Sequence, residues 1–436
     1  MAGKKRPIQA VKGMRDILPD EQRYWRFVND NVEKLAIQYG FKRIDTPIVE
    51  ETDLFVRSIG TTTDIVEKEM YSFKDKSEDN LTLRPEMTAP IIRSYIEHGM
   101  VNLPQPVKLY YFGQCFRREK PQAGRYRQFF QYGFEVIGEE DPVVDAQLIH
   151  LAYRLFLKLN VKIGVHINCI GCTECRPDYL KAFKEYLRKH RNNLSEISKK
   201  RLLKNPLRIL DSKESEDQEI IKEAPQQVDY LCDDCKKHFI SVLEYLDELE
   251  VPYNLNHTIV RGLDYYSRTT FEVFAEGAED GRQTALCGGG RYDGLVEQMG
   301  GLPTPAVGFA GGVERFVNLL KDTDTKVVDY PKPIVFVAQL GVEARKKALK
   351  LFEQLYAKGV PVAENMAKSG LKPQLEMANK LGVRYCLIIG QKEMVDGTVM
   401  IRDMEGGIQE IVDANKAVDE IVKRLEKLKE IENKEV

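Results

Sequence analysis

The chain has 436 residues, of which 43% are hydrophobic and 30% are charged, and its formal net charge is −2 at pH 7. A chain of this length can hold two or three domains, and no apolar run approaches the length of a membrane span. The basic N-terminal stretch lacks the apolar core of a signal peptide, so we expect a cytoplasmic protein without membrane association. The balanced charge neither supports nor excludes RNA binding, because local basic patches are enough for it.

The N-terminal region predicts a helix followed by a short strand. Residues 19–40 carry apolar side chains at three- and four-residue spacing, and Gly40 marks the end of this helix. Residues 41–50 predict one strand that contains Pro47. Because proline cannot donate a ladder hydrogen bond, we expect this strand at a sheet edge or an interface.

Residues 81–88 predict a strand that leads into a helix over about 89–98. Glu86 and Thr88 are two residues apart, so their side chains point the same way if the backbone is extended. A carboxylate and a hydroxyl together can accept hydrogen bonds from an ammonium group. A helix-capping role for Thr88 is the alternative.

Residues 109–138 predict an antiparallel hairpin. Two strand-like stretches, 109–116 and 128–137, flank a loop that contains proline and glycine. Five cations lie in or beside this loop: Arg117, Arg118, Lys120, Arg125 and Arg127. Alternation places Phe129, Gln131 and Glu135 on one face of the returning strand. An aromatic ring, an amide and a carboxylate beside arginines suit a nucleotide and a small zwitterion.

A helix over 141–160 and a strand over 161–171 precede a segment of different character. Residues 171–250 are charged and mostly helical, which indicates an insertion into the core. Its flanks carry two C-x-x-C pairs, Cys172, Cys175, Cys232 and Cys235, and two such pairs suffice for a tetrahedral zinc site. The segment between the pairs is far longer than in a compact zinc finger. Cys169 could compete as a ligand, and plain thiols are the alternative.

The next residues return to strand-like alternation over 257–274, interrupted by the string Arg261-Gly-Leu-Asp-Tyr265-Tyr266. The glycine-rich stretch 287–294 is a weak nucleotide signal, because it lacks the Lys-Ser/Thr of a P-loop. A strand then leads into a helix, and Arg315 lies one turn into that helix.

The C-terminal region begins after a polar, proline-containing linker at 322–333. Beyond it, alternating strands and helices predict a small α/β domain with a largely parallel sheet. This pattern alone leaves the ligand of the domain open.

These motifs together resemble the histidyl-tRNA synthetases, a family within the class II aminoacyl-tRNA synthetases. F-R-x-E, a loop and R-x-x-x-F, from Phe116 to Phe129, resemble the second class II signature, and RGLDYY resembles the signature specific to the family. The resemblance implies an α+β catalytic domain on an antiparallel sheet over 1–325, with the helical insertion at 171–250. It also implies a C-terminal α/β anticodon-binding domain over 331–436.

The implied activity is a histidine–tRNA ligase that uses ATP with Mg²⁺ to form histidyl-adenylate and pyrophosphate, then transfers histidine to tRNA. The resemblance also implies a homodimer, built from the first helix and strand. It assigns catalysis to Arg117 and Arg261, and ATP binding to Arg117, Glu119, Arg125, Phe129 and Arg315. The implied histidine-binding residues are Glu86, Thr88, Gln131, Glu135, Tyr265 and Tyr266. Lys120 and Gln122 would meet the tRNA acceptor end, although bacterial members usually have arginine in place of Lys120.

Histidine selection requires contacts to an imidazole, which carries one donor and one acceptor nitrogen when neutral. We expect Glu135 to accept from the ring N–H and the Tyr266 hydroxyl to meet the other nitrogen.

Two other functions are consistent with parts of the sequence. A catalytically silent paralogue that binds histidine would typically lack the C-terminal domain and have degraded motifs, whereas this chain retains both. A zinc-stabilised RNA-binding module explains the cysteine pairs but leaves the arginines unexplained. Histidine-dependent pyrophosphate exchange is expected only of the ligase.

Overall fold

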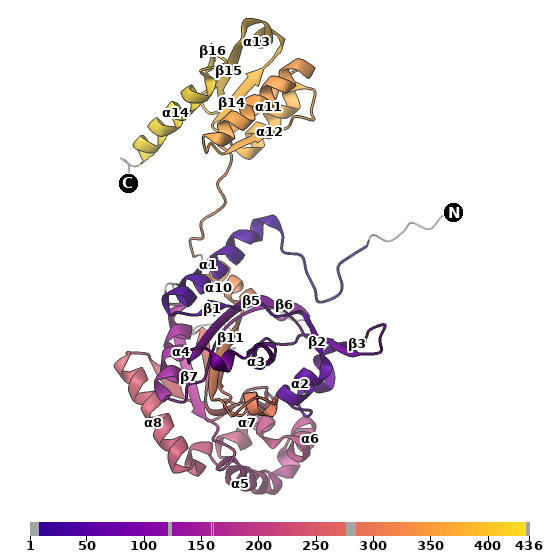
Figure 1. Cartoon of the computed structure of the whole chain (residues 1–436), viewed down its shortest axis with the longest axis vertical. Helices are drawn as coiled ribbons and strands as arrows, with labels where there is room; N and C mark the ends of the chain where they lie inside the picture. Colours follow the sequence, from indigo (N-terminus) through magenta and orange to yellow (C-terminus); the bar gives the residue numbers. More distant parts are fainter. Residues whose placement is uncertain are drawn as a thin grey trace, which may run out of the picture. The chain divides into compact units, whose positions relative to one another are not determined.

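The computed structural model describes residues 8–120, 124–157, 159, 161–275, 285–323 and 325–432. It contains two compact units, Met1–Val327 and Val328–Val436 (Figure 1). Among the described residues, no helix is long and apolar enough to cross a membrane.

The first unit is built on an eight-stranded sheet whose inner strands are antiparallel. From one edge to the other its strands are β1 (Lys42–Arg43), β5 (Val107–Phe116), β6 (Gln128–Ile137), β11 (Ala306–Gly312), β10 (Ala285–Arg291), β9 (Ser267–Ala275), β7 (Ile163–Cys169) and β8 (Tyr253–Leu255). The edge strands β1 and β8 pair in parallel with their neighbours, and every other pairing is antiparallel. The predicted antiparallel catalytic fold is confirmed.

One face of this sheet packs against α1 (Gln22–Gln38), α4 (Pro142–Arg154), α8 (Asp233–Glu248) and α10 (Val313–Asp322). Buried residues on α1 follow the predicted helical spacing and join a core with Tyr132, Phe134 and Val136 of β6. Because side chains alternate along a strand, the remaining residues of β6 face the other side. That second face is covered by a separate cluster to which Met87 and Tyr266 contribute.

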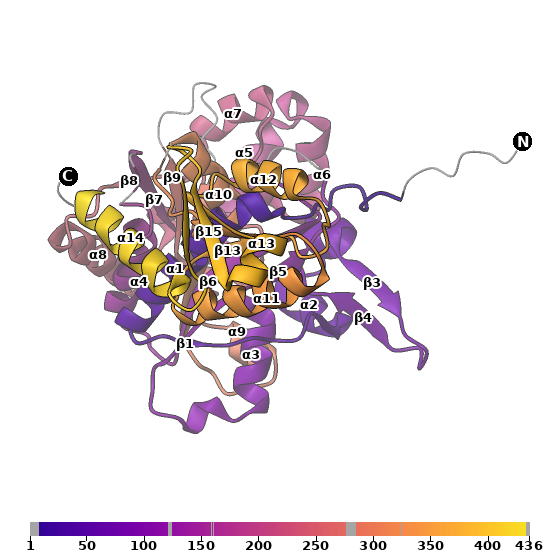
Figure 2. The same cartoon turned by 90° about the horizontal axis from the view of Figure 1, so that it is seen from above.

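The predicted single strand at 41–50 is wrong. The structure has two short strands in different sheets: β1, and β2 (Val49–Glu51), which pairs with β4 (Asn80–Leu83) and through it with β3 (Tyr71–Lys74). Pro47 interrupts the ladder, and the buried Arg84 donates to the carbonyls of Thr46 and Pro47 instead. Figure 2 shows β3 and β4 extending away from the body of the unit.

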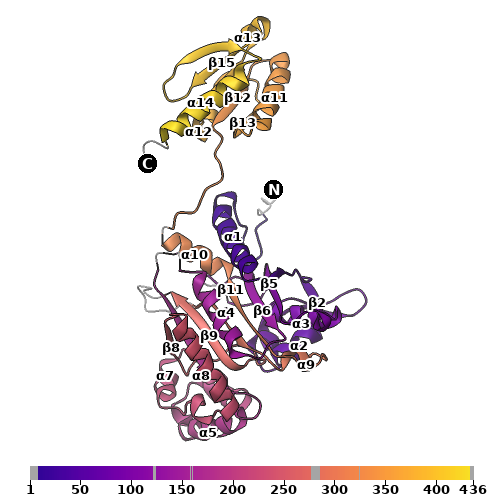
Figure 3. The same ribbon diagram turned by 60° about the vertical axis from the view of Figure 1, so that its left-hand side comes forward.

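The remaining helices of this unit are α2 (Thr52–Ile59), α3 (Thr88–Glu97), α5 (Arg176–Lys189), α6 (Glu196–Lys204), α7 (Ser215–Lys222) and α9 (Leu295–Gln298). Short 3-10 or π turns occupy Pro19–Glu21, Ile65–Glu69, Met100–Asn102, Arg191–Asn193, Pro206–Ile209 and Gln227–Tyr230. Helices α5 to α8 lie between β7 and β8 in the chain and gather at one end of the unit (Figure 3).

The second unit has a five-stranded sheet in the order β13 (Val362–Glu364), β12 (Val335–Gln339), β14 (Tyr385–Ile389), β15 (Thr398–Asp403) and β16 (Gln409–Asp413). Its helices are α11 (Val342–Ala357), α12 (Leu371–Leu381), α13 (Gln391–Asp396) and α14 (Ala417–Glu432). The predicted largely parallel sheet is mixed, because β14, β15 and β16 pair antiparallel. A short turn joins β15 to β16, and a parallel pair needs a longer crossover.

Candidate active site

The site lies on the sheet face opposite α1, α4 and α10, and β6 supplies its central row. Glu135 pairs with Gly308 of β11, and Gln131 pairs with Gly312. An added Cβ at Gly308 would overlap the Glu135 carboxylate, so the neighbouring strand has no room there for a side chain. The glycines of β11 therefore make space for the side chains of β6.

Glu135 is 1% exposed and is held by hydroxyl groups. Its Oε1 accepts a hydrogen bond of 2.8 Å from the Thr88 hydroxyl, and its Oε2 accepts from the Tyr292 hydroxyl. Burial raises the pKa of Glu135 to about 8, although the hydrogen bonds from Tyr292 and Thr88 lower it. Each carboxylate oxygen can accept a further hydrogen bond, so Glu135 remains able to bind a ligand donor.

Glu86 caps α3, in place of Thr88, which was the capping residue predicted as an alternative. The Glu86 carboxylate accepts from the backbone N–H groups of Thr88 and Ala89, each at 2.8 Å. The Tyr265 hydroxyl lies 3.5 Å from Glu86 Oε2. Burial raises the pKa of Glu86, and the two backbone hydrogen bonds lower it. Glu86, Thr88, Glu135 and Tyr265 thus form one connected group.

The arginines of the hairpin lie beside its aromatic ring. Arg117 donates from Nε to the Pro85 carbonyl at 2.8 Å, and its guanidinium carbon lies 5.4 Å from the centre of the Phe129 ring. Arg125 Nη1 lies 3.2 Å from Glu119 Oε2. Glu119 therefore links the loop to the strand end that carries Arg117.

Arg315 lies near the same loop. An added Cβ at Gly124 would lie 3.6 Å from Arg315 Cγ, so the end of the hairpin loop packs against α10. Burial lowers the pKa of Arg315, and the neighbouring Arg125 lowers it further. The electrostatic effect of Arg125 on Arg315 means that the two cations lie near each other, which favours an anionic ligand between them. Lys120 is exposed, and Gln122 lies outside the described residues.

Arg261 approaches from the turn before β9. It pairs with Glu272, and its guanidinium carbon lies 5.7 Å from the centre of the Tyr266 ring. Burial opposes the charge, yet Glu272 and Tyr266 raise the pKa of Arg261. Its buried Nε has no hydrogen-bond partner, so one donor remains available to a ligand.

Three residues of this face were not predicted from the sequence: the buried Tyr292 and Tyr111 and the half-buried Glu272. The Tyr111 hydroxyl is buried without a hydrogen-bond partner, and its ring lies against Gly133. In the structure Gly288 of β10 lies opposite Glu272 of β9, and Gly290 lies opposite Thr270, a cross-strand register that no local pattern in the sequence specifies. The glycine-rich stretch is a sheet strand rather than a phosphate loop.

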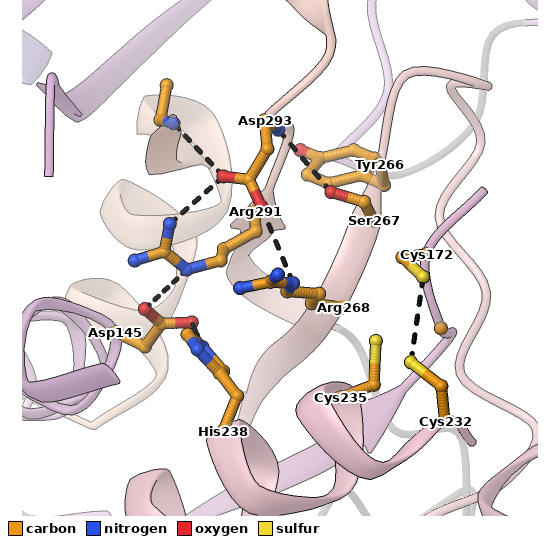
Figure 4. A network of polar contacts seen from close by, with 12 residues as sticks. Asp145, Cys172, Cys232, Cys235, His238, Tyr266, Ser267, Arg268, Arg291 and Asp293 are labelled. Atoms are coloured by element: carbon orange, nitrogen blue, oxygen red, sulfur yellow. Dashed lines mark hydrogen bonds and ion pairs between the residues drawn. The ribbon is translucent and has the colours of Figure 1, made fainter. Parts of the chain in front are cut away.

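On the sheet face covered by α4 and α8, a buried ion-pair network around Arg291 holds the segment that carries Tyr292 (Figure 4). Arg291 donates from Nε to Asp145 at 2.8 Å and from Nη1 to Asp293 at 3.0 Å. His238 Nε2 lies 3.3 Å from the other Asp145 oxygen. These contacts hold β10 against α4 and α8.

The four cysteines predicted as a metal site come together. The Sγ atoms of Cys172, Cys175, Cys232 and Cys235 all lie within 4.8 Å of one another, and Cys169 is not in this group.

Comparison with known proteins gives consistent matches along the chain. Residues 13–316 match the family model described as histidyl-tRNA synthetase, and residues 334–424 match the model described as anticodon binding domain. A histidine–tRNA ligase of Dehalococcoides mccartyi strain 195 is 45% identical over 418 residues, covering 96% of this chain and 100% of the relative. One of Acetivibrio thermocellus is 42% identical, covering 96% and 99%. The crystal structure of apo Staphylococcus aureus histidyl-tRNA synthetase superposes with a TM-score of 0.77 at 34% identity, covering 95% of this chain and 99% of that one.

Proposed function

The chain belongs to the histidyl-tRNA synthetase family, and from that premise we propose how its residues perform the reactions of a histidine–tRNA ligase. The enzyme activates L-histidine with ATP and charges tRNA with it. The observation that supports our assignment best is the single sheet face that holds the buried Glu135 together with Arg117, Phe129 and Arg261.

In the first step, the histidine carboxylate attacks the α-phosphorus of ATP, and pyrophosphate leaves. Two anions must approach each other, so fixed cations at the reacting centre lower the barrier. We assign this role to Arg117, held by the Pro85 carbonyl, and to Arg261, held by Glu272. Both guanidinium groups are positioned before substrate binds, so little reorganisation is needed.

ATP lies on the hairpin in this proposal. Phe129 stacks on the adenine, with Arg117 already beside the ring, and Glu119 accepts from the adenine amino group. Arg125 and Arg315 bind the phosphates, since the loop brings them close together. Mg²⁺ enters with ATP as part of the substrate complex.

Histidine is selected by Glu135 and Tyr266. Glu135 accepts from one ring N–H, and the Tyr266 hydroxyl meets the other ring nitrogen. Glu86, Thr88, Gln131 and Tyr265 hold the α-amino end. An apolar competitor would leave these buried polar groups unpaired, which disfavours it by roughly 10⁴-fold.

In the second step, the terminal ribose hydroxyl of the tRNA attacks the carbonyl carbon of the histidyl-adenylate, the ester to tRNA forms, and AMP leaves as the carbonyl–phosphate bond breaks. Lys120 and Gln122 meet the acceptor end, and the C-terminal unit, roughly 331–436, binds the anticodon. The catalytic core extends over 1–325.

We also propose a cytoplasmic homodimer. Exposed apolar side chains lie on α1 and around β2, with Ile37 68% exposed and Ile48 42% exposed. The edge strand β1 lies nearby in the chain. Light scattering on the eluting protein would give twice the chain mass, and a single-chain mass would exclude the dimer.

Histidine-dependent ATP–pyrophosphate exchange tests the proposal. Glu135→Ala and Arg261→Ala should each abolish exchange, while the exposed controls Glu140→Ala and Arg188→Ala should retain it. Wild-type exchange with histidine alone among the amino acids supports the pocket. Histidine binding without any exchange would identify a regulatory paralogue instead.

A further inference from the structure

The four clustered cysteines lie outside the proposed substrate sites, at the two ends of the helical insertion. Cys172 and Cys175 precede α5, while Cys232 and Cys235 begin α8. The Sγ–Sγ distances are 3.7 Å between Cys172 and Cys175, 3.8 Å between Cys172 and Cys232, and 3.9 Å between Cys175 and Cys235. Figure 4 shows Cys172, Cys232 and Cys235 of this group near the chain segment of Tyr266 and Arg268.

These distances fit one tetrahedral ion. Four sulfurs at about 2.3 Å from a central zinc lie about 3.8 Å apart. Disulfide bonds are excluded, because their sulfurs lie about 2.05 Å apart, and all eight cysteines are free. A four-iron cluster does not fit either, since four irons between the sulfurs would hold them farther apart.

The backbone around the first pair is shaped to accept the sulfurs. Gly171 has a φ of +68°, and an added Cβ there would lie 2.8 Å from Cys175 Sγ. The Cys172 amide lies 3.2 Å from Cys175 Sγ and donates to it. Amide donors of this kind stabilise a thiolate, and glycine is the residue that leaves room for it.

We propose that Cys172, Cys175, Cys232 and Cys235 bind one structural zinc ion, and that this ion fixes the turn of residues 261–268 at the histidine pocket. Four thiolates complete the coordination, so the ion has no open position for catalysis. The second part rests on the proposed histidine-binding role of Tyr266.

Arg176, next to Cys175, connects the two sites. It donates to the Tyr266 carbonyl at 2.7 Å and to the Ile170 carbonyl at 3.2 Å. The Arg268 amide donates to the Gly171 carbonyl at 2.9 Å, and the Ile170 amide donates to the Arg268 carbonyl at 2.8 Å. Residues 170–176, which carry the first cysteine pair, are therefore hydrogen-bonded to residues 266–268 through both main-chain and side-chain groups.

Elemental analysis of the purified full-length protein tests the metal site. We expect about one zinc per chain in the wild type, and loss of that zinc in Cys172→Ser and Cys235→Ser. Cys169→Ala is the matched control, because Cys169 is buried in the same region outside the group, and it should retain zinc. Cobalt added to the metal-free protein should give the visible absorption of a tetrahedral tetrathiolate.

The cobalt spectrum does not depend on whether a serine variant folds. Zinc below about one-tenth per chain together with no cobalt spectrum would overturn the site, as would zinc retained in both serine variants. An iron-tetrathiolate spectrum in the purified protein would overturn the assignment to zinc.

Arg176 is a positioning residue in this scheme, and its variants separate the two parts of the proposal. Arg176→Ala should keep zinc but raise the KM for histidine about tenfold in pyrophosphate exchange, with kcat within about twofold of wild type. Arg176→Lys retains one donor group, so its KM for histidine should lie between those of the wild type and Arg176→Ala. An unchanged KM would overturn the coupling to the pocket, whereas failure of Tyr266→Phe to affect histidine binding would count against the pocket assignment and leave the zinc result standing.

Discussion

On the face of the eight-stranded sheet that holds the proposed pocket, Glu135 is buried with hydroxyl donors from Thr88 and Tyr292. On the face covered by α4 and α8, Asp145 is buried with the Arg291 guanidinium and the His238 ring. Both carboxylates are at most 1% exposed. The difference lies in whether a cation accompanies the acid.

A buried carboxyl group that is held only by neutral hydrogen-bond donors is costly to ionise. Its oxygens can still accept a hydrogen bond from a ligand. A carboxylate that forms an ion pair with a buried guanidinium already has its charge compensated within the protein. We infer that the first arrangement is suited to binding and the second to holding the fold, and the predictions below test this division.

The largest expected effect concerns the ion pair. Arg291→Met should lower the free energy of unfolding by about 3–5 kcal/mol, because it leaves Asp145 buried without its cation. Urea unfolding followed by the fluorescence of Trp25, the only tryptophan and a residue of the same core, measures this.

The double variant Arg291→Met with Asp145→Leu also removes the unpaired Asp145 carboxylate. It should therefore recover much of the lost free energy of unfolding. If Arg291→Met alone costs less than about 1 kcal/mol, the network does not hold the fold.

Glu135→Gln should affect activity far more than stability, the reverse of Arg291→Met. It keeps the size of the side chain and breaks no ion pair, so the free energy of unfolding should change little near pH 4.5, where Glu135 is protonated in the native state. The kcat/KM for histidine should fall about 100-fold, equivalent to about 3 kcal/mol, since the amide replaces a carboxylate acceptor. Pyrophosphate exchange at varied histidine measures it, and Asp145→Asn provides the comparison, with stability lost instead. A Gln variant with full activity would remove Glu135 from the pocket.

One part of the pocket face and the cysteine group could be predicted from patterns visible in the sequence. Alternation along one strand placed Phe129, Gln131 and Glu135 on the same face, and the two C-x-x-C pairs indicated the cysteine group. Both patterns depend on fixed local geometry, a period of two or a spacing of three, which holds wherever the segment folds.

The contacts across strands could not be predicted in the same way. The Tyr292 contact to Glu135 depends on β10 and β6 both flanking β11, which the sequence does not specify. Glu86 capping α3, rather than Thr88, depends on the exact first residue of a helix. The interruption at Pro47 was visible, but the buried Arg84 that satisfies the freed carbonyls was not.

The pH dependence of stability gives a third test. Folding raises the pKa of Glu135 to about 8, so the native state holds a proton that the unfolded chain has already lost. This contribution to stability is fully present below about pH 4.5, the ordinary value, and is lost as the pH rises to about 8.

The wild type should therefore lose stability relative to Glu135→Gln as the pH rises through that range, by at most about 1.4 kcal/mol per pH unit. Urea unfolding of both proteins at several pH values measures the difference. Parallel curves would show that Glu135 is already ionised at neutral pH.

Tyr292→Phe should have the smallest effect and is the sharpest test of the pocket face. The variant removes only the hydroxyl that donates to Glu135 Oε2, while the ring stays packed edge-on against Tyr265. Losing a donor to the carboxylate should raise the pKa of Glu135 further and raise the KM for histidine about fivefold, or about 1 kcal/mol. The rise should be present at neutral pH and shrink at pH values well above the pKa of Glu135 in both proteins, where the carboxylate is ionised with or without the Tyr292 hydroxyl. A KM change of the same size at every pH would mean that Tyr292 shapes the pocket without acting through the charge of Glu135.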